Sequence, residues 1–136
     1  MIILVVGSAA LLYPFATGEV PSWRIQVVDQ HGKPISGIGV REYWGNDSVD
    51  YRDSVQDSMT DDKGFVTFPA RTVTATLLRR VLYPLQNLSG GTHSSWGPHA
   101  TVIVLVNDAS QEIGSVDWSA GPLPERVVVQ PLQSAK

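Results

Sequence analysis

Short runs in which apolar and polar residues alternate cover most of this chain after its first eighteen residues. Ile25 and Val27 alternate with their neighbours until Asp29, and Val66 and Phe68 share one parity before Pro69 ends their run. Alternate side chains of a strand lie on opposite faces, so this pattern predicts strands that bury one face. Further strands are expected at 37–44, 71–77, 100–106 and 125–130, and 113–118 is either an edge strand or an irregular connection.

Two segments depart from simple alternation. The run 100–106 is apolar on both parities except at Thr101, which predicts a central strand covered on both sides. After residue 76, leucine and valine recur at intervals of three and four until Pro84 interrupts the pattern. This spacing predicts a short helical insertion near 76–84.

Two polar turns each combine an aspartate with a glycine. In 61–64, the Asp61 carboxylate can accept a hydrogen bond from the backbone two residues on, and Gly64 can adopt a positive φ without a Cβ penalty. Asp29 and Gly32 repeat this arrangement before Pro34. A chain reversal is therefore expected at both places.

The first eighteen residues carry no charged side chain and predict an N-terminal hydrophobic helix. At about 1.5 Å per residue such a helix reaches about 27 Å, slightly less than a hydrocarbon core of about 30 Å. Tyr13 and Phe15 suit the aromatic belt of a membrane anchor, whereas Ala16 and Gly18 form a weak signal-peptide cleavage motif. An uncleaved anchor is the favoured interpretation, and a cleaved signal or a buried strand are the alternatives. The first two place the remaining domain outside the cytoplasm.

The turns carry a resemblance to a known family. The pattern Val28-Asp29-x-x-Gly32-x-Pro34-Ile35-x-Gly37-x-Gly39-Val40, followed by Thr60-Asp61-x-x-Gly64-x-Val66-x-Phe68, resembles the first half of a carboxypeptidase regulatory-like domain. The resemblance covers residues 23–70. It implies an all-β, Greek-key type, transthyretin-like β-sandwich of about seven strands over 22–132, preceded by the hydrophobic segment 1–18. Such modules are mostly noncatalytic and occur on envelope and secreted proteins, and the helical insertion departs from their pattern.

The composition of the chain excludes several classes of function. The chain has 136 residues, 43% of them hydrophobic, which suits one domain with a single core. Its net charge of −3 gives no electrostatic footprint for nucleic acid. Because there is no cysteine, a disulfide framework, a thiolate metal site and a cysteine nucleophile are excluded.

Residues 46–62 concentrate acidic side chains. They include Asp47, Asp50, Asp53, Asp57, Asp61 and Asp62. An EF-hand loop would need acids at alternate positions with a central glycine and a closing glutamate, and that spacing is absent. A solvated edge strand or loop is therefore expected, and calcium binding is the alternative.

The polar segment 86–99 is the best candidate for a binding loop. We predict a ligand site made by Arg79, Arg80, His93, Trp96 and His99, with Trp96 as a stacking platform. The alternatives are an ordered loop without a ligand, a metal held by the histidines, and a hydrolase using Ser94 or Ser95. A six-residue histidine spacing matches no known ligand pattern, and the Gly-x-Ser-x-Gly motif is absent. No catalytic residue, metal ligand or cofactor is therefore predicted.

Together these patterns predict a noncatalytic binding or structural module of the cell envelope. Its expected partners are a membrane, through the N-terminal segment, and an envelope protein or a glycan. We expect the domain to face the periplasm or the cell surface, or to be secreted if the leader is cleaved. A small hydrolase or metal-dependent enzyme that uses the loop 86–99 is the alternative.

Overall fold

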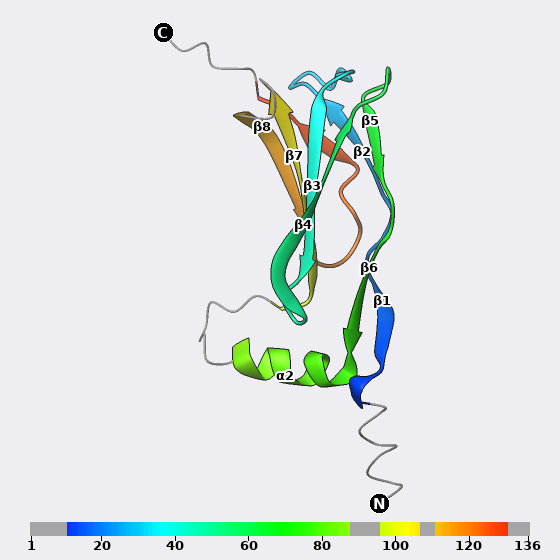
Figure 1. Ribbon diagram of the computed structural model, residues 1–136. Coiled ribbons are helices and arrows are strands. Elements are labelled where there is room, and N and C mark those ends of the chain that lie inside the picture. The colour runs from blue at the N-terminus through cyan, green and yellow to red at the C-terminus, as the bar shows by residue number, and fades with distance from the viewer. Residues whose placement is uncertain (1–10, 88–95, 107–110, 131–136) are drawn as a thin grey trace, which may run out of the picture.

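The structure is a computed structural model that describes residues 11–87, 96–106 and 111–130 (Figure 1). In chain order its elements are β1 (Pro14–Val20), β2 (Trp23–Val28), β3 (Gly39–Asn46), β4 (Asp50–Met59), β5 (Phe65–Phe68), β6 (Arg71–Thr76), α2 (Leu77–Asn87), β7 (Pro98–Val106), β8 (Gln111–Trp118) and β9 (Arg126–Val128). Within the described residues the strands form three sheets, in the orders β1-β6, β5-β2-β9 and β4-β3-β7-β8. The molecule is mostly β, as the alternating pattern predicted.

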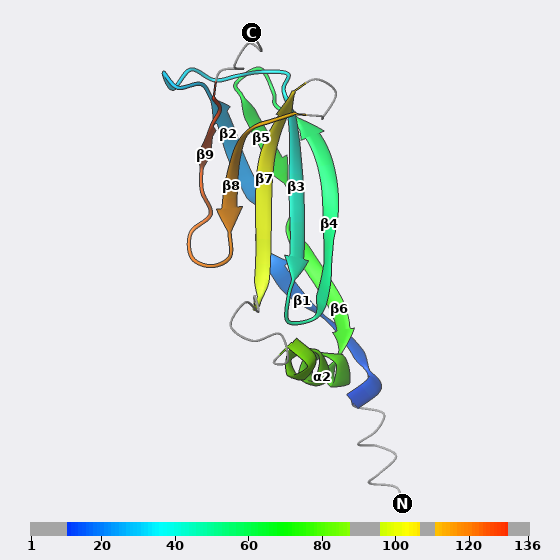
Figure 2. The ribbon, with the colours of Figure 1, turned by 90° about the vertical axis from the view of Figure 1, so that its left-hand side faces the viewer.

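The three-stranded and four-stranded sheets face each other as the two layers of a sandwich (Figure 2). Trp23, Ile25 and Phe68 from one layer pack with Val40 and Val102 from the other in a single buried cluster. These two layers contain seven strands, and the pair β1–β6 is additional. The burial of both inner faces explains why these segments alternate in sequence.

β7 is central, as its apolar sequence predicted, because it pairs with β3 on one side and β8 on the other. The prediction that both of its faces are covered is wrong: Val102 and Val104 face the other layer and are fully buried, whereas Thr101 and Ile103 on the opposite parity are only half-buried. β4 and β8 are the edges of this sheet. The acidic segment is therefore mainly an edge strand, which was one of the two forms expected for it, and 113–118 belongs to the other edge strand.

The prediction of a hydrophobic helix over residues 1–18 is wrong for residues 14–18. Pro14–Val20 is a strand, β1, which pairs antiparallel with β6 from Pro14↔Thr76 to Val20↔Arg71. The residues of 71–76 offer a free strand edge, and Phe15 and Thr17 have high strand propensity, so pairing is preferred to helix extension. Residues 1–10 lie outside the described residues. No helix in the described part of the chain is long and apolar enough to cross a membrane.

The β1–β6 ribbon continues the β2–β5 pair (Figure 1): Val20 pairs with Arg71 in the register of Trp23 and Phe68, and the register then shifts by one residue between Val20 and Gly18. The ladder is interrupted at Pro21 and Pro69. Proline has no N–H to donate, so it ends a strand within a sheet. The two prolines therefore divide one long pair of antiparallel segments, 14–28 and 65–76, into an upper part inside the sandwich and a lower ribbon that extends beyond it.

Both predicted turns are confirmed. Asp61 Oδ1 accepts hydrogen bonds from the backbone N–H groups of Lys63 and Phe65, each at 2.8 Å. Asp29 Oδ1 does the same for His31 at 2.8 Å and Lys33 at 2.9 Å. These backbone donors lower the pKa of both carboxyl groups.

Gly64 is required by the second turn. Its φ is +75°, and a Cβ there would lie 2.9 Å from the carbonyl oxygen of Val27. The turn 61–64 therefore packs directly on the end of β2.

The predicted helix is also confirmed, although α2 runs from Leu77 to Asn87 and continues past Pro84. It begins directly after β6, and Thr76 Oγ1 accepts a hydrogen bond from Arg79 N at 3.2 Å, which caps the first turn. The helix lies across the end of the molecule, below the ribbon and the four-stranded sheet (Figures 1 and 2).

Candidate functional site

A cleft with a mixed polar and apolar lining opens between the β1–β6 ribbon and the β3–β4 hairpin. Its volume is about 290 Å³. The lining comes from Glu19, Thr72 and Val73 of the ribbon and from Trp44, Gly45, Asn46, Asp50, Arg52 and Ser54 of the hairpin. The cleft therefore combines carboxylates, a guanidinium, hydroxyls and one aromatic ring.

A buried ion pair lies beside this cleft, in contact with its lining residue Trp44. Glu42 has 0% of its side chain exposed and Arg71 has 12%. Arg71 Nε donates to Glu42 Oε2 at 3.1 Å, and its Nη2 donates to the same oxygen and to Gln56 Oε1, the latter at 2.8 Å. The Arg71 guanidinium also lies 3.8 Å from the centre of the Trp44 ring. The guanidinium is thus held by a carboxylate, an amide and an aromatic face together.

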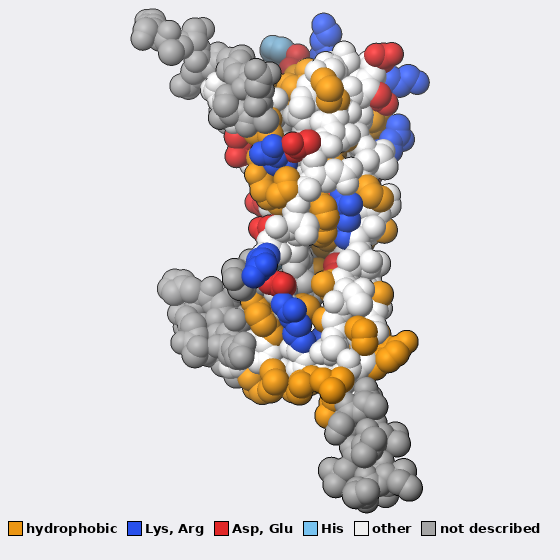
Figure 3. Space-filling view, viewed as in Figure 1, with side chains coloured by type: hydrophobic (Ala, Val, Ile, Leu, Met, Phe, Trp, Pro, Cys, Tyr) orange, Lys and Arg blue, Asp and Glu red, His pale blue; other side chains and the backbone are white. Residues whose placement is uncertain are grey.

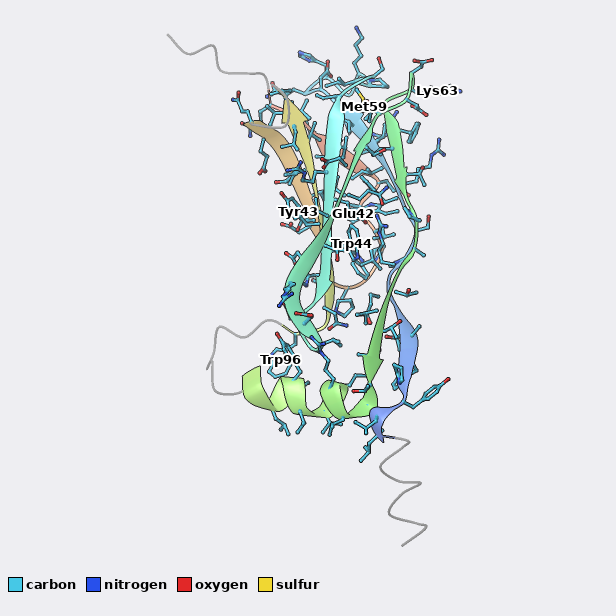
Figure 4. The ribbon with its side chains drawn as sticks, viewed as in Figure 1. Glu42, Tyr43, Trp44, Met59, Lys63 and Trp96 are labelled. Carbon is cyan, nitrogen blue, oxygen red and sulfur yellow. The ribbon has the colours of Figure 1, made fainter. Side chains whose placement is uncertain are left out.

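The strand β3 positions these groups by simple alternation. Glu42 and Trp44 point toward the ribbon, whereas Tyr43 points to the outer face (Figure 4). Burial is the larger influence on Glu42 and raises the pKa of its carboxyl, against the opposing effect of Arg71. A carboxylate and a guanidinium are therefore fixed inside an otherwise apolar layer.

Glu19 is a second buried carboxylate, and it lines the cleft directly. Its Oε1 accepts a hydrogen bond from Thr17 Oγ1 at 2.8 Å, and its Oε2 accepts one from the amide of Asn46. This second bond joins the ribbon to the end of β3. Glu19 is therefore preorganised, with both oxygens partly occupied by structural partners.

The structure places the predicted site residues at several points. Arg79 Nε donates to the carbonyl of Val49 at 3.0 Å, and Arg79 Nη2 pairs with Asp50 at 2.8 Å. Arg80 Nη2 donates to Thr17 Oγ1 at 2.9 Å, and its guanidinium lies over the Phe15 ring. The two arginines therefore attach α2 to β4 and to the ribbon.

Of the other predicted residues, His93 and Trp96 precede β7, and His99 is the second residue of β7. His99 Nε2 lies 2.9 Å from Asp53 Oδ1, and Nδ1 lies 3.5 Å from Asp47 Oδ2. Trp96 is exposed at the α2 end of the molecule (Figure 4). His93 lies outside the described residues. The contacts of Arg79, Arg80 and His99 therefore go to three different sets of partners.

The acidic side chains of residues 46–62 also bind different partners. Asp57 pairs with Arg41 through two hydrogen bonds of 2.6 and 2.8 Å, and this pairing lowers the pKa of Asp57. Asp50, Asp53 and Asp61 have the distinct partners given above. Among the described residues, no three histidine, aspartate or glutamate side chains form a group that could hold a metal ion.

The sequence prediction missed Glu19, Glu42 and Arg71. A signal for one of them exists, because Glu42 shares its parity with Ile38, Val40 and Trp44 and must therefore face inward with them. Its partner could not be found in the same way, since Arg71 is 29 positions away. Glu19 was missed because residues 14–18 of its own strand, β1, were assigned to the apolar leader.

Comparison with known proteins gives no further information about this site. No protein-family model, curated protein or solved structure matches the chain.

Proposed function

We propose that this chain is a noncatalytic binding module of the cell envelope, displayed outside the cytoplasm by its N-terminal apolar segment. We further propose that the cleft takes a small polar ligand of the saccharide class. The observation that carries the proposal is the mixed lining of the cleft, in which hydroxyl, amide and carboxylate groups surround the Trp44 ring.

The cleft fits one small molecule. Ligand pockets in proteins occupy roughly 300–1,000 Å³, and this cleft, at about 290 Å³, lies at the lower limit. A sugar ring presents hydroxyls that both donate and accept hydrogen bonds, together with an apolar C–H face. Ser54, Thr72 and Asn46 suit the hydroxyls, and an aromatic ring such as Trp44 suits the C–H face.

The carboxylates support binding better than hydrolysis. A glycosidase needs two carboxyl groups that reach the glycosidic bond from opposite sides. Of the two carboxylates that line the cleft, Glu19 is held by Thr17 and Asn46, and Asp50 is paired with Arg79. These partners favour a fixed wall over a pair of groups that exchange protons with a substrate.

The envelope location rests on sequence. Residues 1–10 carry no charge, and the pattern of residues 23–70 resembles carboxypeptidase regulatory-like domains, whose fold is a transthyretin-like Greek key. A two-layered β body agrees with that resemblance. The domain would then present its cleft to the glycans and proteins of the envelope.

A titration of the detergent-solubilised full chain tests the ligand. Nuclear magnetic resonance would follow a neutral hexose, an N-acetylhexosamine and a hexuronate as separate probes, with Ser54→Ala and Thr72→Val as cleft variants. Each variant removes one hydroxyl, so binding should weaken by roughly two- to tenfold. Thr67→Val, at an exposed position of β5, should change nothing. The proposal fails if no probe gives saturable shifts at cleft residues, or if the shifts map to another surface.

A further inference from the structure

The helix α2 is oriented opposite to an ordinary surface helix. Leu77, Val81, Leu82 and Leu85 lie on its outer side with 41–56% of each residue exposed. In a globular protein the apolar stripe of an amphipathic helix normally faces the core. Here it faces away from the body, and the lower surface of the molecule is consequently apolar (Figure 3).

The polar side of α2 explains this orientation. Arg79 is bound to Val49 and Asp50, and Arg80 to Thr17, so both cations point into the body. These contacts join α2 to two separate sheets. The helix therefore cannot turn its apolar side inward without breaking them, and that side is a permanent feature of the surface.

The apolar surface continues from α2 onto the start of the described chain. Leu11, Leu12, Tyr13 and Phe15 are all exposed. They lead into β1 at the end of the molecule where α2 lies (Figures 1 and 3). Residues 1–10, which precede them, include Ile2-Ile3-Leu4-Val5-Val6 and carry no charge. The most apolar stretch of the sequence therefore joins the chain at this surface.

The opposite end of the molecule is charged. It carries the two aspartate turns, with the exposed side chains of Lys33, Asp62 and Lys63, and Figure 3 shows charged side chains gathered there. The described domain is thus polarised along its length, with an apolar base and a charged tip. Such polarity orients a protein at a boundary between lipid and water.

We propose that the outer side of α2, together with Leu11, Leu12 and Tyr13, lies on a lipid bilayer as an interfacial contact. The proposal rests on the membrane attachment in the proposed function and adds a second, in-plane contact to it. Interfacial helices usually combine apolar insertion with basic residues that attract anionic lipids. Because Arg79 and Arg80 are both bound to partners on the body of the molecule, this helix should dock on neutral lipid and depend little on salt.

Lipid is favoured over a second copy of the chain by continuity. A dimer through α2 would bring together two apolar bases, each of which also has to accommodate the uncharged residues 1–10. A bilayer accepts both features at one surface without a further partner. The absence of cysteine in the natural chain makes the docking measurable, since any introduced thiol is unique.

The experiment uses the full chain in phosphatidylcholine vesicles, a fraction of whose lipids carry a nitroxide quencher near the headgroup. An environment-sensitive fluorophore is attached to Leu85→Cys on α2, or to Met59→Cys, an exposed residue at the charged end (Figure 4). The label at position 85 should emit at shorter wavelength and be quenched by the lipid. The label at position 59 should do neither, and raising the salt concentration should change neither result.

A double variant tests the side chains themselves. Val81→Ser with Leu82→Ser, in the chain labelled at position 85, should lower the ratio of docked to undocked helix by about tenfold or more, because two half-exposed apolar side chains no longer enter lipid. Val55→Ser with Val128→Ser removes two exposed valines from the sandwich and should leave the signal unchanged.

Flotation of the same vesicles separates this inference from the proposed function. If the chain does not float, the membrane attachment and the docking of α2 both fail. If it floats while the label at position 85 stays in water, the docking of α2 alone is overturned. Shielding of position 85 without vesicles, accompanied by a doubled mass, would also overturn it in favour of a contact between two copies.

Discussion

Glu42 and Arg71 illustrate how single residues shape this sandwich. A buried ion pair loses the hydration of both charges, and its mutual attraction offsets that loss only when the geometry is good and further hydrogen bonds are present. Arg71 has these additional partners in Gln56 and Trp44. Glu42 has fewer, since its Oε1 accepts no hydrogen bond within the described residues. The pair therefore fixes the position of Trp44 at the cleft more than it stabilises the fold.

Glu42 should make the free energy of unfolding depend on pH. Burial raises this pKa above its ordinary value of 4.5, so the folded state holds the proton more tightly than the unfolded state. The associated stability is complete below 4.5 and is lost as the pH rises through the folded pKa. The free energy of unfolding of the natural protein should therefore fall, relative to Glu42→Gln, as the pH is raised from about 4 to about 8 in urea titrations.

A matched variant separates burial from net charge. Glu125→Gln removes the same charge from an exposed position. If the free energy of unfolding of the natural protein instead rises relative to that of Glu42→Gln as the pH is raised, attraction by Arg71 exceeds the effect of burial on the pKa of Glu42.

Thr60 provides a second residue-level prediction. It is buried, and its hydroxyl accepts a hydrogen bond from Ile38 N at 3.1 Å and donates one to Ile35 O at 2.9 Å. Thr60→Val keeps the shape but leaves two backbone groups without partners. The free energy of unfolding should fall by about 1–3 kcal/mol. Thr67→Val is exposed on β5 and should be close to neutral, so equal stability of the two variants would contradict the role of Thr60.

Among the elements, the β1–β6 ribbon depends most on what surrounds it. It has two strands, and an isolated two-stranded ribbon is only marginally stable in water. The bond between Glu19 and Asn46 attaches it to β3, and Arg80 attaches it to α2. Local unfolding of the ribbon and local unfolding of α2 should therefore be coupled.

Replacement of Arg80 tests this coupling. Arg80→Met keeps the aliphatic stem but removes the hydrogen bonds to Thr17 and to the Phe15 carbonyl. Hydrogen bonds from a charged group contribute about 1.5–3 kcal/mol, so amide exchange in β1 and α2 should accelerate by roughly tenfold or more. Exchange in β2, β3 and β7 should stay as it was. Arg126→Met, at an exposed position of β9, serves as the control, and uniform acceleration over the whole chain would contradict the prediction.

The elements that could be predicted from sequence are those whose cause is local. The turn at 61–64 follows from Asp61 and Gly64 alone, and α2 follows from its own spacing of leucines. β1 could not be predicted, because it exists through pairing with a strand more than fifty residues later. An uncharged leader followed directly by Pro14–Val20 offers no boundary to recognise.

The candidate site shows the same limit. Trp44 packs against the core cluster, on the face of β3 that Val40 also occupies. Its position beneath a guanidinium depends on the stacking of β6 over β3, which no local pattern encodes. The cleft lies where the ribbon leaves the sandwich, between β1–β6 and the β3–β4 hairpin. No pattern within a single segment of the sequence can therefore predict where the cleft lies.

At the scale of the whole molecule, the apolar base and the charged tip define an axis along which the domain can be oriented relative to a membrane. If the base rests on a membrane, the turns at Asp29 and Asp61 lie furthest from it. The cleft lies between these ends, beside the hairpin β3–β4 and within the lower half of the domain. Ligands would then be bound near the membrane and not at the tip.

This orientation predicts where a single thiol can be reached. Lys63 lies in the turn at the charged end and is exposed, so Lys63→Cys should react with a membrane-impermeant maleimide in spheroplasts or intact cells without lysis (Figure 4). The natural chain, which has no cysteine, should not react. Leu82→Cys should react several-fold more slowly before detergent is added, because lipid covers that side of α2. Equal rates at both positions would argue against the orientation, and a reaction of Lys63→Cys that requires lysis would place the domain on the cytoplasmic side.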